Sequence, residues 1–502
     1  MKNIKEKIIK NKNLLFLTII VGLIVHLPLL TKDILSADII LNNTYYSGYS
    51  WEVSLGRFGL FIIGLLKNYI VIPHIEIFLS LILVSFISIE LIDLFKIKNK
   101  LLQILTCIIL VVCPNISSTL LFNYCSLPYT YSFFASVTAI YTLIKANNKY
   151  IKIILPIILL VSALSMYQAY LPVSITLLVL YYLKELLNNE FKYKEALKNI
   201  LIIVISIILY FILMKLSQKV LNINMSNYTN ASSFGIKNII NMPKQILLTY
   251  QVFIDYFFTN KILTNTNLYN NIINGLLLIT VLLNIIYITI KNKLKIQNIL
   301  LIIFLVLTLP IYINCILLIM PSATMQLLMS SAYILLIPFL FSIQDNKIYK
   351  IISIILISIL IRNYTIQDNA TYKSLEIKHN KVLNISNDLV KSIKELGYNK
   401  EVMIIGNINE NEFYNYNTEL EISNINKLTY GFIIDLPFFW DEFNNNKNGW
   451  TRYLYQYTGT NINYVSKDKY DEILNSKEIK SLEAYPSKKS IKLIDDVIVI
   501  KL

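Results

Sequence analysis

Charged side chains are scarce in this chain. Only 15% of its residues are Asp, Glu, Lys or Arg, whereas 55% are hydrophobic. Soluble domains carry nearer a quarter of charged residues, so the composition is typical of a membrane protein. Acidic side chains are fewer than basic ones, with a formal net charge of +15. The lysines gather in short connecting segments, which is typical of cytoplasmic loops and not of a nucleic-acid-binding surface.

Cysteine and histidine are also rare. The four cysteines lie in or beside apolar segments without paired metal-ligand spacing: Cys107, Cys113, Cys125 and Cys315. We expect them to be buried as small hydrophobic side chains, with no disulfide framework. The three histidines are far apart in the chain: His26, His74 and His379. No histidine-based metal cluster can be built locally, and we predict neither a metal site nor a cofactor.

Long apolar runs dominate the first part of the chain. Eleven stretches predict about eleven membrane helices of about 20 residues each: 14–31, 71–95, 101–122, 126–144, 153–167, 170–187, 199–216, 272–290, 296–313, 325–343 and 349–362. The first run follows a lysine-rich start and is long for a signal peptide. It predicts an uncleaved helix with a cytoplasmic N-terminus.

The distribution of lysine predicts the topology. Turns 123–127, 168–169 and 314–324 contain no Lys or Arg, while the alternate connections are lysine-rich. Under the positive-inside rule, 32–70 is the first outer loop, and 217–271 is a long outer loop. The predicted membrane domain covers 1–362, in a multi-pass protein of the cytoplasmic membrane.

The polar tail, 363–502, predicts a small extracytoplasmic α/β domain. Residues 370–396 are expected to form a helix, and Val402–Gly406, Tyr430–Leu436 and Asp495–Leu502 are expected to form buried strands. Polar helices such as KDKYDEILNS separate these strands, which favours an α/β arrangement. The tail contains no glycine-rich phosphate loop and no catalytic-triad signature.

The first outer loop combines charged and aromatic residues at the predicted membrane surface. Asp38 follows the first helix, and Trp51, Glu52 and Arg57 precede the next apolar stretch. A lipid-linked sugar phosphate presents its reactive carbon at this depth. A carboxylate could take a proton from an acceptor hydroxyl there, and a cation could stabilise the departing phosphate. The alternative is a loop whose charges are simply solvated, and the residue types alone do not separate the two.

Three motifs resemble the bacterial glucosyl transferase type II family of the GT-C class of membrane glycosyltransferases. The family's first outer loop has an acidic pair, Ile, Gly-Tyr-x-Trp and Gly-Arg. This chain has SADII, then GYSW at Gly48–Trp51, then GRF at Gly56–Phe58. SMYQAYLP at Ser165–Pro172 is similar to a later Tyr-Gln motif, and Ala484–Leu502 is similar to a terminal strand pair. The resemblance implies a GT-C-like membrane domain.

The resemblance also implies site residues. Asp38 becomes the candidate catalytic base, Arg57 a contact of the donor phosphate, and Trp51 part of the sugar site. Ala37 stands where the family often has an acidic residue. Either one carboxylate suffices, or Asp33 or Glu52 supplies the second, or the chain is an inactive member of the family.

The Tyr-Gln motif adds a second pair of candidate substrate-binding residues. Tyr167 and Gln168 are expected at the outer end of a helix, where Gln168 could hydrogen-bond a sugar hydroxyl. The alternative is that this residue caps a tight helical hairpin.

The implied function is an inverting hexosyltransferase. Its donor would be a polyprenyl-phosphate sugar, with glucose as the expected sugar, and its acceptor a surface glycan, such as O-antigen, or its lipid-linked precursor. Membrane lipids are also expected partners, whereas nucleic acid is not. Whether an ion binds near Asp38 stays an open question. The alternatives are a transporter or flippase, with charges at mid-membrane, and a glycan polymerase, with cation-rich outer loops.

Overall fold

A computed structural model describes residues 2–34, 42, 46, 48–226, 236–259, 261–263, 268–319, 325–406, 408, 425, 427–430 and 443–502. Contacts divide the chain into two units. The first contains Met1–Leu30 and Thr44–Asp368, and the second contains Thr31–Asn43 and Asn369–Leu502. The predicted division after residue 362 falls within one helix of the structure, Lys347–Gly397.

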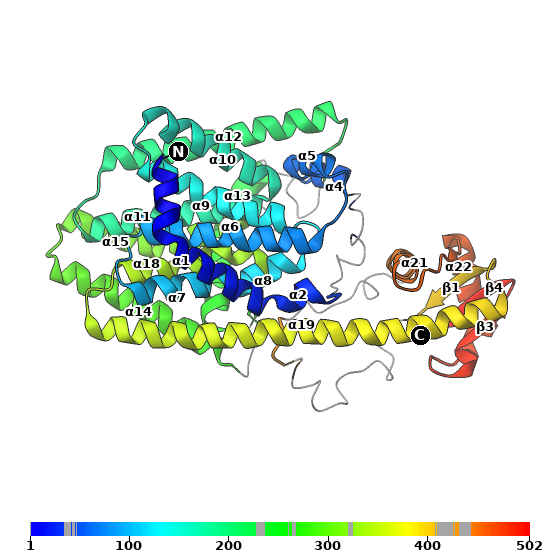
Figure 1. Ribbon diagram of the computed structural model, residues 1–502. Coiled ribbons are helices and arrows are strands. Elements are labelled where there is room, and N and C mark those ends of the chain that lie inside the picture. The colour runs from blue at the N-terminus through cyan, green and yellow to red at the C-terminus, as the bar shows by residue number, and fades with distance from the viewer. Residues whose placement is uncertain are drawn as a thin grey trace. The chain divides into compact units, whose positions relative to one another are not determined.

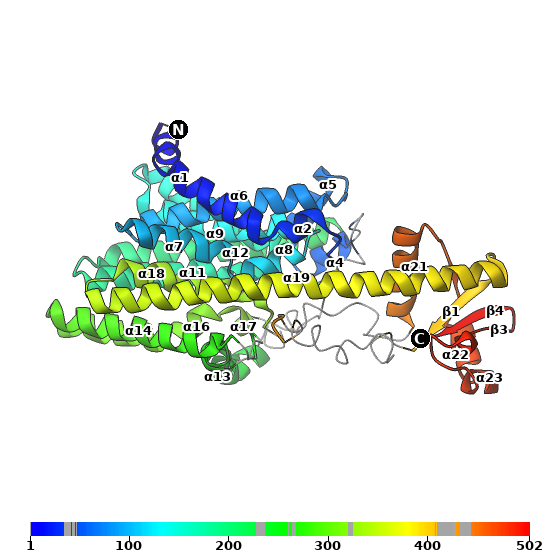
Figure 2. The same cartoon turned by 60° about the horizontal axis from the view of Figure 1, so that its bottom comes forward.

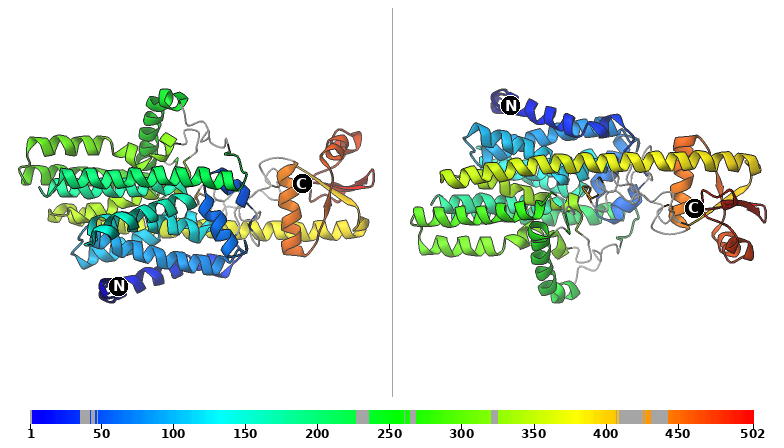
Figure 3. Two further views of the ribbon diagram at one scale, coloured as in Figure 1. Left: turned by 90° about the horizontal axis from the view of Figure 1, so that it is seen from above. Right: turned by 90° about the horizontal axis from the view of Figure 1, so that it is seen from below.

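The first unit is built from helices (Figure 1). In chain order they are α1 Lys2–Val25, α2 Leu27–Thr31, α4 Tyr49–Ser54, α5 Phe58–Leu66, α6 Pro73–Leu94, α7 Lys100–Val111, α8 Pro114–Leu121, α9 Ser126–Lys145, α10 Lys149–Met166, η1 Gln168–Tyr170, α11 Leu171–Leu187, α12 Tyr193–Val220, α13 Ile236–Phe258, α14 Asn270–Lys291, α15 Ile296–Leu307, α16 Leu309–Ile313, α17 Ile316–Ile319, η3 Leu327–Leu335, α18 Leu336–Ser342 and the start of α19 Lys347–Gly397. Most of the long helices lie side by side, with α1 at one edge (Figure 3).

Polar residues and prolines mark the helix boundaries. The Asn99 side chain accepts a hydrogen bond from Leu102 N at 3.2 Å and caps α7. Asn148 caps α10 in the same way, through Tyr150 N and Ile151 N. Pro114 stands in the first turn of α8, where its missing N–H costs nothing. These local signals divide the apolar sequence into separate helices.

Each of the eleven predicted apolar segments falls on one helix or on two consecutive helices. Within the described residues, seven helices are long and apolar enough to cross a membrane. They are α6, α7 with α8, α10, η1 with α11, α12, α14 and α19. These helices identify a membrane protein, while the count of eleven spans stays a prediction.

Helix α19 runs without a break from Lys347 to Gly397. The sequence predicted a membrane span at 349–362 and a separate helix at 370–396, so the expected separation was wrong. Polar residues between them contact the segment that leads into α14 and do not break the helix: Asn363 Nδ2 donates to Leu268 O at 2.8 Å, and Gln367 Nε2 donates to Leu263 O at 2.8 Å. Buried polar side chains with such partners are compatible with a continuous helix.

The second unit contains a four-stranded sheet and short helices (Figure 2). Its elements after α19 are β1 Glu401–Ile405, α21 Asn444–Thr458, β2 Asn463–Tyr464, α22 Lys467–Leu474, α23 Lys477–Lys480, η8 Lys488–Ser490, β3 Ile491–Ile494 and β4 Val497–Lys501. The strand order is β2-β1-β4-β3; β1 pairs in parallel with β2 and β4, and β3 with β4 is antiparallel. The predicted strand at Tyr430–Leu436 lies almost wholly outside the described residues.

Both faces of this sheet are covered. Ile404 and Ile500 face a core completed by α19 and α21, including Leu389 and Trp450. Met403 and Val499 face the other core, which includes Tyr470 of α22. A strand buried on both faces requires a continuous apolar run, which explains why VMII and VIVI contain no polar residue. The second unit is therefore a small α/β layer structure.

Candidate functional site

A tight turn between α4 and α5 positions the central side chains of the site. Gly56 has φ +83°, a left-handed conformation that suits glycine. A Cβ atom there would lie 2.7 Å from both Tyr210 Oη and Met214 Sδ. The turn also allows Arg57 N to donate to Glu52 O at 2.8 Å. The Gly-Arg motif thus has a steric reason, because this turn brings Arg57 back toward α4.

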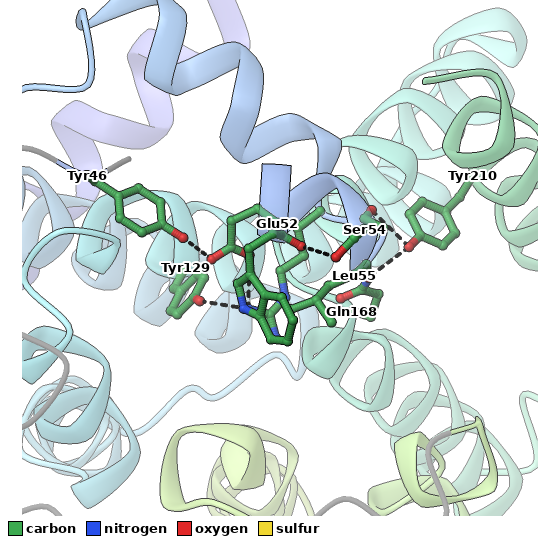
Figure 4. Close-up of polar contacts among 10 residues, drawn as sticks. Tyr46, Glu52, Ser54, Leu55, Tyr129, Gln168 and Tyr210 are labelled. Carbon is green, nitrogen blue, oxygen red and sulfur yellow. Dashed lines mark hydrogen bonds and ion pairs between the residues drawn. The ribbon is translucent and has the colours of Figure 1, made fainter. Parts of the chain in front are cut away.

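Glu52 and Arg57 form a buried ion pair. Arg57 Nη1 lies 3.1 Å from Glu52 Oε2, and the two side chains are 17% and 4% exposed, respectively. Tyr46 Oη donates to the other carboxylate oxygen, Glu52 Oε1. Figure 4 shows Tyr46 and Tyr129 on one side of Glu52, with Gln168 and Tyr210 on the other. A charged pair with these hydrogen bonds is held in a single geometry.

Two tyrosine rings pack beside the guanidinium group. The rings of Tyr129 in α9 and Tyr167 are stacked, with centroids 4.4 Å apart and an interplanar angle of 16°. Arg57 Cζ lies 4.6 Å from the Tyr167 centroid, and Nη1 lies 3.4 Å from Tyr129 Oη. Among the described residues, the buried Arg57 Nε has no hydrogen-bond partner. One donor of this guanidinium is therefore uncommitted.

Burial also sets the protonation states of this cluster. It is the main cause that raises the pKa of the Tyr46 phenol, and the charge of Glu52 contributes, so Tyr46 stays a proton donor. Burial opposes the charge of Arg57, yet Tyr129 and Glu52 raise its pKa well above the ordinary value. Arg57 is therefore charged at neutral pH.

Gln168 connects the α4–α5 turn to α12. Its amide group donates to Leu55 O at 2.8 Å and to Tyr210 Oη at 2.7 Å. Tyr210 Oη in turn donates to Gly56 O at 3.1 Å. Both hydrogen atoms of the Gln168 amide are thus used within the protein, and they connect the turn to α12.

A second ion pair follows directly after α5. Lys67 Nζ lies 2.6 Å from Glu76 Oε1 in the first turn of α6, and Glu76 is buried. Lys67 Nζ also lies 3.4 Å from Tyr124 O. The ring centroids of Tyr124 and Tyr46 are 4.9 Å apart. This aromatic packing links the two ion pairs.

The structure brings four of the predicted site residues together: Glu52, Arg57, Tyr167 and Gln168. The Trp51 residue is on α4 and is 47% exposed. Asp38, the predicted base, lies outside the described residues, as does the rest of the SADII motif. The roles of all six residues stay predictions.

Sequence reasoning did not assign Tyr46, Tyr129, Tyr210 or Lys67 to the site. Tyr46 is buried and donates a hydrogen bond to Glu52. Tyr210 carries a hydroxyl group within the apolar run of α12. A polar group in such a run is a sequence signal for a buried polar contact. As for metal ions, the described part of the chain contains no group of three or more His, Cys, Asp or Glu side chains that could hold one.

Apolar helices and a buried, hydrogen-bonded ion pair together define a helical membrane protein with a polar site in its first unit. Residues 27–343 match the family of the glucosyl transferase GtrII. The chain belongs to this family, which confirms the resemblance found in the motifs and indicates a membrane glucosyltransferase. No curated protein and no solved structure shows a significant match.

Proposed function

We propose that this protein transfers glucose from a polyprenyl-phosphate donor to a surface glycan or its lipid-linked precursor, at the outer face of the cytoplasmic membrane. The observation that carries the proposal is the buried Glu52–Arg57 pair, which lies within the part of the chain that matches the family. A fixed cation in a water-poor pocket stabilises developing negative charge more strongly than a solvated one.

The proposed reaction is a direct displacement with inversion. The acceptor hydroxyl oxygen attacks the anomeric carbon while the bond from that carbon to the phosphate oxygen breaks. Asp38 takes the hydroxyl proton, and the polyprenyl phosphate leaves with the electron pair of the broken bond. Arg57 offers its uncommitted Nε–H to the departing phosphate, since Nη1 is engaged by Glu52 and Tyr129.

The surrounding residues keep Arg57 in position during this step. Glu52 and the ring of Tyr167 fix the guanidinium plane, while Gln168 and Tyr210 hold the preceding turn. The Trp51 side chain is 47% exposed, and we place it against a sugar face of the substrate. Positioning of this kind supplies much of the catalytic effect in transferases that use no cofactor.

A small apolar cavity lies beside the site. The cavity has a volume of ≈ 50 Å³ and shares Gln168 and Tyr210 with the polar network. Phe211, Met214 and Met225 contribute to its walls. We propose that the isoprenoid chain of the donor enters here when the flexible methionine side chains move, because the cavity itself is too small for a prenyl unit.

Transfer from labelled polyprenyl-phosphate glucose to the glycans of the same cells tests the proposal. Membranes with the native protein should incorporate label, and Asp38→Asn should reduce the rate by about 10²–10⁴-fold. Asp345→Asn is the matched control, because this exposed carboxylate pairs with Lys291 at the surface. Undiminished transfer by Asp38→Asn would remove Asp38 from the role of base, and no transfer by the native protein would contradict the proposed function.

A further inference from the structure

The second unit contains an open polar groove with a volume of ≈ 700 Å³. This volume is within the range of about 300–1,000 Å³ for small-molecule sites. One wall is the C-terminal part of α19, with Asp388, Lys391, Ser392 and Glu395. The other wall is the segment around Tyr485 and Lys488 that leads into β3.

Hydrogen bonds hold these walls in place. Tyr485 Oη donates to Asp388 Oδ2 at 2.7 Å, which ties the segment to α19 at one end of the groove. Tyr485 N donates to Lys501 O at 2.9 Å and fixes the same segment to β4. Ser490 N donates to Ser487 O at 3.0 Å, which closes the turn at η8. The groove is therefore preformed within the second unit.

The charges along the groove balance. Asp388 and Glu395 are acidic, and Lys391 and Lys488 are basic, so the formal sum is zero. In the part of the chain that the structure describes, Lys391, Glu395 and Lys488 form no ion pair with protein. A phosphate would meet two carboxylates here, and a cation would meet two ammonium groups. A neutral ligand that both donates and accepts hydrogen bonds fits this lining best.

We infer that this groove binds a neutral saccharide segment, namely part of the acceptor glycan. The ring of Tyr485 and the exposed Leu396 and Pro486 offer apolar surface for the C–H faces of sugar rings, and the carboxylates and ammonium groups match their hydroxyls. The identification of the ligand as the acceptor rests on the proposed function. The groove would then select the glycan, while the first unit carries out the transfer.

The test measures glycan binding to the full chain in detergent micelles, without donor. The probe is oligosaccharide cut from the surface polysaccharide of the same cells, freed of lipid and labelled with a fluorophore, and fluorescence anisotropy gives Kd. Ser392→Trp fills the groove from α19 and should abolish binding. Lys394→Trp is the matched control on the same helix, because Lys394 is exposed and is not part of the groove; it should bind like the native protein.

A second variant tests the chemistry of the ligand. Glu395→Gln removes one charge without changing shape and should raise Kd about tenfold. Unchanged or tighter binding by Glu395→Gln, with loss of binding by Lys488→Ala, would identify an anion site and overturn the inference. Equal binding by the native protein and Ser392→Trp, or no binding by the native protein, would also overturn it.

These outcomes are separable from those of the transfer assay. Native binding with no transfer contradicts the proposed function and leaves a glycan-binding groove. Native transfer with no binding, or with binding unaffected by Ser392→Trp, contradicts the groove and leaves the transferase. An unchanged melting temperature of Ser392→Trp and Lys394→Trp shows that both variants are folded.

Discussion

Glu52→Gln is the sharpest test of the buried ion pair. The amide keeps the shape of the carboxylate and retains an oxygen that accepts from Tyr46. It removes the charge that faces Arg57 Nη1 at 3.1 Å. The amide nitrogen then replaces Oε2, so a second donor faces Arg57 Nη1. The variant therefore leaves a buried guanidinium without its counter-charge and without the acceptor of this hydrogen bond.

The expected cost follows from burial. Removing one partner of a buried ion pair costs about 3–5 kcal/mol. Arg57 is 17% exposed, so water screens part of its charge, and we expect the lower end, about 3 kcal/mol. In a unit of this size such a loss lowers the melting temperature by on the order of 5 °C.

Thermal melting in detergent, followed by far-UV circular dichroism, measures this effect. Glu195→Gln is the control, because the ion pair of Glu195 with Lys152 is partly exposed: the Glu195 side chain is 42% accessible and that of Lys152 is 21% accessible. Such pairs contribute less than about 1 kcal/mol to stability. The double variant Glu52→Gln/Arg57→Met removes both charges and should regain most of the lost stability. Equal melting temperatures for Glu52→Gln and Glu195→Gln, or a further loss in the double variant, would refute the reasoning.

Three further predictions concern the turn, its anchor and the second unit. Gly56→Ala should lower the free energy of unfolding by about 3 kcal/mol, because the new Cβ is strained and overlaps its neighbours. Gly459→Ala, with φ +66° but open space around its Cβ, should lower it by about 1 kcal/mol, and equal melting temperatures for the two variants would contradict the steric argument. Tyr210→Phe should cost about 1–3 kcal/mol, because buried donor and acceptor groups of Gln168 and Gly56 lose a partner, and an unchanged melting temperature would exclude that contribution. Ile404→Ala should cost about 2–5 kcal/mol and expose the second unit to proteolysis while the membrane helices resist; an unchanged digestion pattern would show that β1 is not central to that core.

The local features of this fold could be predicted from the sequence. Apolar runs identified the positions of the membrane helices, and VMII and VIVI identified β1 and β4, because helix and strand formation here follows from stretches of side chains that must leave water. The proximity of Glu52 and Arg57 could also be expected from the sequence, because the two residues are five positions apart and a single turn at a glycine brings them together. The family motifs marked this turn before its geometry was known.

Other features were not predictable in this way. Asn363 and Gln367 of the continuous helix α19 find their partners near the start of α14, about a hundred positions away in the chain. Similarly, a polar residue in an apolar run indicates either a break or a buried contact, and only its partner decides between them.

The sequence by itself determined that this is a helical membrane protein with a polar tail, because hydropathy is a sum over neighbouring residues. Only the tertiary structure decided which polar groups meet: Tyr46, Tyr129 and Tyr210 come from three separate segments to Glu52, Arg57 and the turn between them. The physical reason is that a buried charge or amide must be paired, while the choice of its partner depends on how distant helices pack.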